Sequence, residues 1–295
     1  MLVVFGSVNF DLIFRVPALP LPGETKLAPQ AVQMPGGKGA NQAVAAARDG
    51  ARVVLAGAVG DDALADAALA GMQDVDTSRV TRIAGVPTGC AAVIVDEAGE
   101  NMIAVGAGAN LSARAAQVED ALLGPATTLL LQMEVQAGEN VALIRRARAR
   151  GARVVLNLAP AGAIAADALR ALDVLVVNDS EAAWLAGQLG SGSDAAALRA
   201  ALGVDVVRTL GSRGAEFACA AGNASVPAMQ VAAVDTAGAG DGFVGVLGAA
   251  LDRGATLADA TFRAIVAAGL ACTRMGTQAS LPSAAEIDRA MPRRA

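Results

Sequence analysis

Short runs of apolar residues recur along the chain, and Ala-rich stretches with helical spacing lie between them. The runs that we predict as buried strands are residues 2–5, 53–55, 128–131, 154–156, 174–177 and 206–207. The predicted helices include residues 41–48, 62–72, 138–150 and 180–189. Strands that alternate with helices are typical of parallel βαβ units. The pattern therefore predicts a doubly wound α/β fold, with a mostly parallel sheet covered by helices on both faces.

Two regions depart from this rhythm. Residues 11–34 hold an extended run, a proline-rich turn and a second extended stretch, and residues 86–106 have the pattern of a hairpin with strands at 90–95 and 101–105. Together they predict a small β-sheet lid inserted into a single domain that spans 1–295. A small sheet with one apolar face needs a cover, so we expect a homodimer formed through the lid.

Composition narrows the class of protein. Hydrophobic residues make up 54% of the 295 residues, charged residues make up 17%, and the net charge is −5. This balance is too apolar for a disordered chain and too acidic for general binding to nucleic acid or a membrane surface. Five arginines between 145 and 153 are interpreted as the solvated end of a helix, where cations offset the dipole. No uncharged apolar run reaches the roughly 18 residues that a membrane span needs.

Histidine and tyrosine are absent. Without histidine, the chain cannot use a Ser-His-Asp or Cys-His nucleophile, His-ligated zinc or a histidine pH switch. Cys90, Cys219 and Cys272 lie far apart and form no CxxC pair, which favours reduced thiols over a disulfide framework. The first residues lack the basic region of a signal peptide. We therefore expect a cytoplasmic protein.

The most informative segment is the glycine-rich run VDTAGAGDGF at 234–243, which precedes an apolar run at 244–251. It predicts a loop that opens a helix, where small residues let a ligand approach amides with a partial positive charge. Asp241 lies in the same turn and could accept a proton from an attacking hydroxyl group while those amides stabilise a moving phosphoryl group. Taken alone, the segment is equally typical of an ordinary helix cap, and it is not a Walker loop.

Two further segments carry polar groups suited to a small ligand. The run GGKGANQ at 36–42 precedes a predicted helix, and Lys38 and Asn41 supply hydrogen-bond donors beside the glycines. By itself this run could be only a flexible turn and a helix cap. Asn9 and Asp11 share one face of an extended stretch, because side chains alternate along a strand. Polar groups on an apolar face need partners, and a polyhydroxy ligand supplies both donors and acceptors.

Further motifs follow in a fixed order. The first half of the chain holds GSVNFD at 6–11, PGET at 22–25, GGKGANQAVAAA at 36–47, VGDD at 59–62, TG at 88–89, GEN at 99–101 and GAN at 108–110. The second half holds QME at 132–134, NLAPA at 157–161, NDSE at 178–181, TLGSRG at 209–214, the loop at 235–241, TRMG at 273–276 and SLP at 280–282. Through this series the chain resembles the ribokinase-like (pfkB-type) carbohydrate kinases from end to end.

The resemblance implies transfer of the γ-phosphoryl group of ATP to the primary (5-) hydroxyl of D-ribose, with Mg²⁺ as cofactor and K⁺ as activator. It implies that Asp241 is the catalytic base and that the anion hole is formed by Gly238, Ala239 and Gly240. The sugar-binding residues implied are Asn9, Asp11, Gly37, Lys38, Asn41, Glu134 and Asp241. The partners expected are therefore a small sugar and ATP, with no nucleic acid and no membrane.

The same resemblance implies the nucleotide and metal sites. The residues implied beside the nucleotide are Asn178, Glu181, Thr209, Leu210, Gly211, Ser212, Arg213, Gly214 and Gly240, with magnesium near Asn178 and Glu181. The residues implied around K⁺ are Asp235, Ala237, Ala271, Arg274, Gly276 and Ser280. A monovalent cation at that loop would order its backbone and strengthen the field of the anion hole.

Several positions depart from the family's usual pattern. Phe10 is bulkier than the small residue usual between the asparagine and aspartate of the lid, although alternation should point it away from them. Gly242 and Val244 replace the threonine and asparagine that commonly follow the base, and Leu158 replaces a frequent proline. The helix around 264–268 lacks a polar residue often found near adenine. These departures bear on substrate preference and rate.

Two alternatives stay open beside a ribose kinase. The first is a related kinase that acts on fructose, 2-keto-3-deoxygluconate, deoxyribose or a nucleoside, because the fold and anion hole are shared and specificity lies in the lid. The second is a sugar-binding homologue that has lost catalysis, which Gly242 favours weakly and the intact Asp241 opposes. Turnover with excess ATP separates the two classes.

Overall fold

The computed structural model describes residues 1–97 and 100–292. Within these residues, a nine-stranded sheet has the order β13-β12-β11-β10-β9-β8-β1-β4-β5. The strands are β1 (Leu2–Phe5), β4 (Val53–Gly60), β5 (Val75–Ile83), β8 (Thr128–Leu131), β9 (Arg153–Asn157), β10 (Val174–Asn178), β11 (Asp205–Thr209), β12 (Ala215–Cys219) and β13 (Gly222–Val226). All neighbours from β11 to β5 pair in parallel, whereas β12 and β13 add antiparallel pairs at one edge. The prediction of a doubly wound, mostly parallel sheet is confirmed.

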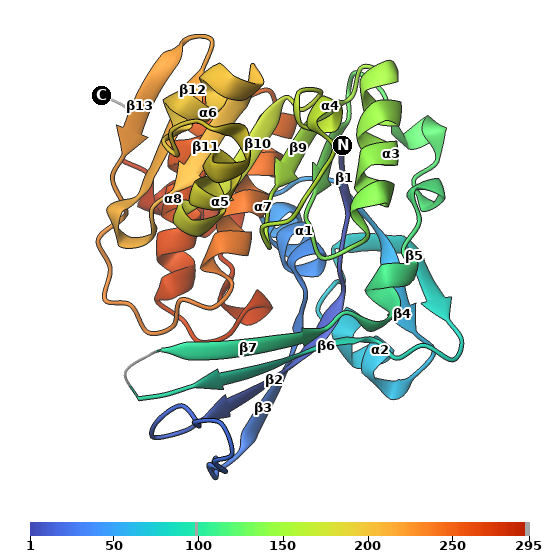
Figure 1. Cartoon of the computed structure of the whole chain (residues 1–295), viewed down its shortest axis with the longest axis vertical. Helices are drawn as coiled ribbons and strands as arrows, with labels where there is room; N and C mark the ends of the chain where they lie inside the picture. The colour runs from blue at the N-terminus through green and yellow to red at the C-terminus, as the bar shows by residue number, and fades with distance from the viewer. Residues whose placement is uncertain (98–99, 293–295) are drawn as a thin grey trace.

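Helices cover both faces of this sheet, as Figure 1 shows. One face packs against α1 (Lys38–Arg48), α2 (Ala63–Leu69), α7 (Ala239–Asp252) and α8 (Leu257–Cys272). The other packs against α3 (Ala137–Ala149), α4 (Ala166–Leu169), α5 (Asp179–Leu189) and α6 (Ala195–Leu202). Helix α9 (Ala284–Ala290) lies on α8. The short 3₁₀ turns are η1 (Gly108–Ser112), η2 (Ala115–Gln117), η3 (Asp120–Leu122), η4 (Gly211–Arg213) and η5 (Gln278–Ser280).

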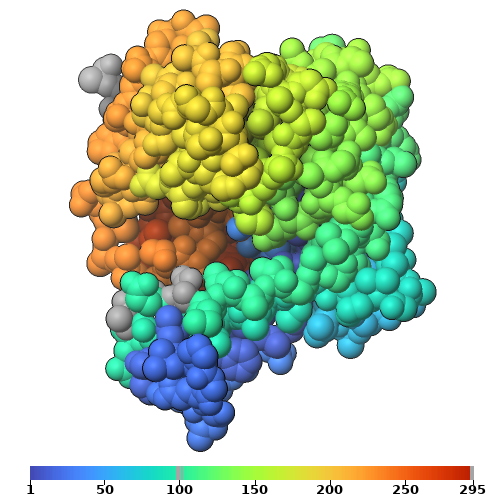
Figure 2. Space-filling model, viewed as in Figure 1, coloured from blue at the N-terminus to red at the C-terminus, as the bar shows by residue number. Residues whose placement is uncertain are grey.

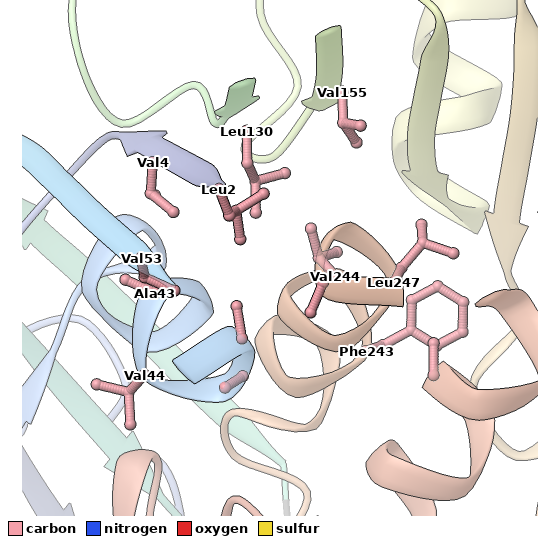
Figure 3. Packing of buried hydrophobic residues seen from close by; sticks show 14 of the residues in the cluster. Leu2, Val4, Ala43, Val44, Val53, Leu130, Val155, Phe243, Val244 and Leu247 are labelled. Atoms are coloured by element: carbon pink, nitrogen blue, oxygen red, sulfur yellow. The ribbon is translucent and has the colours of Figure 1, made fainter. Parts of the chain in front are cut away.

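The hydrophobic core consists of two clusters, one on each face of the large sheet, because side chains alternate between the faces along each buried strand. Leu2 and Val4 of β1 join the cluster that contains α1 and α7, while Val3 and Phe5 join the cluster on the opposite face. Figure 3 shows the first cluster, in which Leu247 of α7 belongs with the strand residues. Each such side chain stabilises the fold by about 1.5–3 kcal/mol when fully buried. A continuous apolar strand therefore signals a sheet covered on both faces.

A second sheet stands away from the first. Its order is β3-β2-β6-β7, with β2 (Asn9–Arg15), β3 (Ala31–Gly36), β6 (Gly89–Val95) and β7 (Asn101–Gly106). We call it the lid sheet, and the larger sheet with its helices the body; Figures 1 and 2 show the two parts. The predicted lid region 11–34 is slightly too short, because β2 and β3 extend to Asn9 and Gly36. Part of the predicted hairpin turn, Ala98 and Gly99, lies outside the described residues.

The arginines at 145–153 lie at the end of α3 and just beyond it, as the sequence predicts. Arg145 pairs with Asp167 at 2.7 Å, and Arg146 pairs with Asp120 at 2.6 Å, both on the surface. Their partners are carboxylates of this chain, which fits a solvated helix end. Across residues 1–97 and 100–292, every helix is too short or too polar to cross a membrane.

Candidate active site

Two adjoining cavities lie where the lid sheet faces the body. The first, which we call the lid cavity, has a volume of about 610 Å³ and lies between the lid sheet and the 233–241 loop. The second, the strand-end cavity, has a volume of about 190 Å³ and lies at the carboxyl ends of β9, β10 and β11. Lys38, Gly238 and Asp241 line both cavities. Figure 2 shows the hollow between lid and body. Ligands of open α/β sheets bind at such strand ends.

The structure brings all the predicted sugar-binding residues together around the lid cavity. They come from the lid strand β2, the start of α1, the segment after β8 and the first turn of α7, and they are Asn9, Asp11, Gly37, Lys38, Asn41, Glu134 and Asp241. As predicted, Asn9 and Asp11 face the same side of their strand. Phe10 points the other way, into the buried cluster of the body, so it does not reach the cavity.

Both carboxylate oxygens of Asp241 accept hydrogen bonds from α1. Asn41 Nδ2 donates to Oδ2 at 2.9 Å, and Gln42 Nε2 donates to Oδ1 at 3.0 Å. A carboxylate oxygen has further lone-pair directions available. Asp241 is therefore held in one orientation and can still accept a proton from a group in either cavity.

Lys38 and Glu134 form a second charged group beside Asp241. Glu134 Oε2 accepts bonds from Ser7 Oγ at 2.5 Å and from the Lys38 main-chain N at 3.0 Å. Lys38 Nζ lies 3.9 Å from Glu134 Oε1. The charge of Asp241, followed by that of Glu134, holds the pKa of Lys38 above its usual range although burial opposes it. A permanent ammonium group therefore lies at the junction of the two cavities.

The lid side of the cavity carries the Asp11 carboxylate, which is only partly paired: the Ala91 backbone forms a hydrogen bond with it. Asp11 is buried, and its Oδ1 has no hydrogen-bond partner among the described residues. Burial, followed by the negative charges of Glu134 and Asp241, raises the pKa of Asp11 to about 7. Its neighbour Asn9 is held by Asn110, whose Nδ2 donates to Asn9 Oδ1 at 2.7 Å. An acceptor left unsatisfied in a polar cavity is suited to a ligand hydroxyl group.

The glycine-rich loop opens α7 as the sequence predicts. Gly238 is the N-cap and has a φ of 75°, a left-handed conformation that glycine adopts without strain. The Gly242 main-chain N donates to Gly238 O at 2.8 Å, which closes the first turn. The Ala239 main-chain N makes a longer bond of 3.3 Å to Thr236 O. Gly238 and Gly240 line the strand-end cavity and Ala239 does not, so the amides of this turn are placed where an anion could bind.

Asn178 and Glu181 line the opposite wall of the strand-end cavity. They form a capping box at the start of α5, in which Asn178 Oδ1 accepts from the Glu181 main-chain N at 2.8 Å, and Glu181 Oε2 accepts from the Asn178 main-chain N at 2.8 Å. Burial raises the pKa of Glu181. The described residues hold no cluster of three or more metal-ligating side chains. One or two carboxylates with phosphate oxygens suffice for Mg²⁺, so this pair fits a shared magnesium ion.

The structure separates the remaining nucleotide-binding candidates. Thr209 lines the strand-end cavity. Leu210, Gly211, Ser212, Arg213 and Gly214 follow it in a turn that does not line this cavity. The guanidinium of Arg213 donates to Asp179 Oδ2 at 2.8 Å, which ties the turn to the start of α5. These residues form a partly exposed rim beside the cavity.

The residues implied around K⁺ lie on two segments, 235–237 and 271–280, that the fold brings together. The Asp235 main-chain N donates to Cys272 O at 3.2 Å. Asp235 Oδ2 in turn accepts from the Gly276 main-chain N at 3.1 Å. Carboxylate and carbonyl oxygens of this kind suit a hard monovalent cation. The donor set therefore fits the implied ion.

Arg274 can contribute only its main-chain oxygen, because a guanidinium is a cation with no acceptor atom; its side chain pairs with Glu286 instead. Its main-chain N donates to Ala271 O at 3.1 Å. Ser280 Oγ donates to Thr277 O at 2.8 Å and keeps its own lone pairs. The segment is thus closed by local bonds beside the start of α7.

The structure shows what surrounds Gly242 and Val244, two of the residues that depart from the family pattern. A Cβ atom at Gly242 would approach Leu281 Cδ2 to 2.9 Å, so a larger residue there requires Leu281 to move. Val244 is buried and lines the strand-end cavity with its apolar side chain. Neither residue displaces Asp241 or the sugar-binding residues.

Four polar residues near the site were not predicted from the sequence to be functional. Ser7 binds Glu134, Asn110 binds Asn9, Gln42 binds Asp241, and Asn157 binds Gln42; all four side chains are buried. Each lies inside a motif that the sequence analysis quotes. Their roles depend on partners far away in the chain, which no local pattern reveals.

Comparison with known proteins agrees with this geometry. The family model described as "pfkB family carbohydrate kinase" matches residues 1–284. The chain belongs to the pfkB carbohydrate kinase family. It is thus an ATP-dependent carbohydrate kinase by family, with the ribokinase-like fold that the sequence predicts.

Several members of this family that are similar to the chain are ribokinases, and others are deoxyribokinases. A ribokinase of Schizosaccharomyces pombe is 36% identical over 97% of this chain and 96% of its own length. The crystal structure of a Thermotoga maritima ribokinase has a TM-score of 0.88 and 31% identity, with 98% of each chain covered. The Arabidopsis thaliana ribokinase complexed with ribose and ATP has a TM-score of 0.86 and 27% identity, over 98% of this chain and 97% of that one.

Proposed function

We propose that the protein transfers the γ-phosphoryl group of ATP to the 5-hydroxyl of D-ribose and so forms ribose 5-phosphate and ADP. The observation that carries the proposal is the position of Asp241 at the junction of the lid cavity and the strand-end cavity. A sugar in the first cavity and a nucleotide in the second would meet at this carboxylate. The similarity to ribokinases over nearly the whole chain supports ribose as the sugar.

The chemistry follows from the residues at that junction. The lid cavity holds ribose through Asn9, Asp11 and Asn41, with the 5-hydroxyl directed toward Asp241. Asp241 accepts the proton of this hydroxyl as its oxygen forms a bond to the γ-phosphorus, and the bond from that phosphorus to the β–γ bridging oxygen breaks to release ADP. Lys38 and the amides of the α7 turn stabilise the negative charge on the moving group.

Two cations complete the proposed site. Asn178 and Glu181 would hold Mg²⁺, which neutralises phosphate charge. The segments 235–237 and 271–280 would hold K⁺, with Asp235 as the charged ligand beside the anion hole. Omission of either cation should lower turnover, and replacement of K⁺ by a larger organic cation is the matched control for ionic strength.

The domain and assembly proposals also concern the lid. We infer one kinase domain over residues 1–295, with the lid inserted as two excursions of the chain. Ile103 and Val105 of β7 are about half exposed and line the lid cavity, so a second copy could cover apolar surface here. Light scattering of the intact protein tests for a homodimer, and Ile103→Lys should shift it toward the monomer.

The structure bears on the alternatives as well. A nucleoside kinase needs an aromatic or apolar platform for the base. None of the described residues that line the lid cavity is aromatic, but Val93, Ile103 and Val105 are apolar, so turnover must also separate nucleosides from ribose. A homologue that has lost catalysis has no reason to retain Asp241, Lys38 and the open glycine turn together at the junction of the two cavities. Fructose, 2-keto-3-deoxygluconate and deoxyribose would occupy the same lid cavity as ribose, so turnover must separate them.

The test is coupled ADP release with Mg-ATP and K⁺ across ribose, deoxyribose, fructose, 2-keto-3-deoxygluconate, adenosine, pseudouridine and fructose 6-phosphate. We expect the highest kcat/KM with ribose. A clear preference for another sugar would keep the kinase mechanism and contradict ribose as substrate. Sugar binding by calorimetry without turnover for any compound would contradict catalysis itself.

A further inference from the structure

A chain of buried side-chain amides leads to one oxygen of Asp241. Gln42 is fully buried, and its Nε2 donates to Asp241 Oδ1 at 3.0 Å and to Asn157 Oδ1 at 3.1 Å. Its Oε1 accepts from Gln132 Nε2 at 2.7 Å. Gln132 is also fully buried, and its main-chain O accepts from Asn140 Nδ2 at 2.7 Å. The network joins α1, α7 and the ends of β8 and β9.

The charge of the Asp241 carboxylate fixes which end of the Gln42 side-chain amide faces each neighbour. An ionised carboxylate can only accept hydrogen bonds, so Gln42 must turn its NH₂ group toward Asp241. Its carbonyl oxygen must then face Gln132, which supplies the donor that this oxygen needs. Gln42 therefore has a single amide orientation that satisfies its neighbours.

Asn41 makes the matching contact on the other oxygen of Asp241. Its Nδ2 donates to Oδ2, and its own Oδ1 accepts from Gln278 Nε2 at 3.2 Å. Consecutive helix residues point about 100° apart. The shorter side chain of Asn41 and the longer side chain of Gln42 therefore approach the Asp241 carboxylate from different directions. The torsion that turns a carboxylate is broad when nothing restrains it, and the paired contacts restrain it.

The two amides differ in their access to the ligand. Asn41 lines the lid cavity, where a sugar would contact it. Gln42 lines neither cavity and is sealed beneath Asp241. Loss of Asn41 should thus alter both sugar affinity and turnover, whereas loss of Gln42 acts on the reaction through the side chains that it holds, Asp241 and Asn157.

We propose that Gln42, held by Gln132, is a positioning residue that aims the Asp241 carboxylate at the sugar hydroxyl. This inference rests on the proposed role of Asp241 as base. A carboxylate turned away from the attacking oxygen loses catalysis without losing sugar contacts. Displacement of a reacting group by about 1 Å can cost on the order of 100-fold in rate.

The decisive variant is Gln42→Met, which keeps the length and volume of the side chain but removes the donor. We expect kcat to fall about 10- to 100-fold while the KM for sugar changes less than about threefold. Gln132→Met removes only the bond that orients Gln42, so kcat should fall about 2- to 10-fold. This milder variant provides the measurement if Gln42→Met does not fold.

Gln117→Met is the matched control, because Gln117 is a glutamine whose Nε2 donates to Gly57 O at 2.6 Å and Arg79 O at 2.9 Å, away from both cavities. It should lower the melting temperature and leave kcat unchanged. Equal loss of kcat in Gln117→Met and Gln42→Met would overturn the proposal, since the effect would then be one of stability. Near-normal kcat in Gln42→Met would overturn it as well.

A crystal structure of Gln42→Met separates this inference from the proposed function. A rotated or disordered Asp241 carboxylate would support the positioning role even if the wild-type protein phosphorylated none of the sugars tested. An Asp241 carboxylate in its wild-type orientation would overturn it even if the wild type were an active ribose kinase.

Discussion

The two sides of the lid cavity are built differently. On the body side, Asp241 accepts a bond on each oxygen, and Glu134 is held by Ser7 and Lys38. On the lid side, Asp11 Oδ1 is buried without a partner within the part of the chain that the structure describes. The body-side carboxylates are therefore held before any ligand binds, whereas one oxygen of Asp11 on the lid side is left to a ligand.

The difference reflects what each side has to do. A base and an anion hole act best when their dipoles are already oriented, because no reorganisation is then needed during the reaction. A lid must open to admit its ligand, so a polar group there gains its partner only on binding. The ion pair between lid and body at this cavity is weak: Arg15 Nη2 lies 3.7 Å from Asp235 Oδ2, and the Arg15 side chain is half exposed.

The largest expected effect comes from the fixed side. Asp241→Asn keeps the shape of the side chain but removes the proton acceptor, so kcat should fall by about 10²- to 10⁴-fold. Sugar affinity, measured by calorimetry, should change little because the other sugar-binding residues remain. Near-normal turnover would show that Asp241 is not the base.

The next effect tests how closely the lid strands fit around the Asp11 carboxylate. A Cβ atom at Gly36 would collide with the Asp11 carboxylate. Overpacking of this kind costs about 1–3 kcal/mol, so Gly36→Ala should raise the KM for sugar about 5- to 100-fold with a smaller change in kcat. Gly124→Ala is the control, since a Cβ atom there meets nothing within 4 Å. An unchanged KM in Gly36→Ala would show that the Asp11 position is not critical.

A pH titration sharpens the comparison further. Burial raises the pKa of Asp11 to about 7, so the side chain is mostly protonated below that pH. A sugar hydroxyl bonds more strongly to the charged form, by roughly 1 kcal/mol. The KM for sugar should therefore rise about three- to fourfold as pH falls from 8 to 6. Asp11→Asn should bind more weakly and lose this dependence; a wild-type profile in that variant would assign the titration to another group.

The same group has an opposite effect on the stability of the free protein. The pKa of Asp11 lies near 7 in the folded state and near 3.8 when unfolded. Between these values the unfolded chain has lost a proton that the folded chain retains, so its contribution to the free energy of unfolding falls as pH rises from about 4 to 7. Denaturant titrations of wild type and Asp11→Asn at both ends of that range should diverge accordingly.

The smallest effect is expected from the ion pair between Arg15 of the lid and Asp235 of the body. Exposed ion pairs contribute about 0–1 kcal/mol and are screened by salt. Arg15→Ala should thus raise the KM for sugar by no more than about fivefold, and the difference from wild type should shrink in high salt. A larger, salt-independent change would mean that Arg15 touches the ligand.

Local pattern was enough to predict much of the body. The strands at 2–5 and 128–131 have the predicted bounds, because fully apolar runs between Ala-rich helices leave few alternatives. The strands β5 and β13 escaped prediction: they lie at the sheet edges and carry mostly polar or exposed residues. Edge strands are defined by their pairing more than by their composition.

The candidate site divides in the same way. Asn9, Asp11, Lys38, Asn41 and Asp241 were recognisable because each stands in a short motif beside glycines or on one face of a strand. That they line one cavity was settled by the fold.

The sequence alone therefore determined the class of fold and the set of candidate reactive groups, since both can be recognised from short segments of a few residues. The tertiary structure decided how those groups are held. Gln42 reaches Asp241 across 199 positions of the chain, and Asp11 loses its solvent only when the lid sheet packs beside the body. Hydrogen-bond direction and desolvation depend on neighbours in space, and the order of residues along the chain does not specify those neighbours.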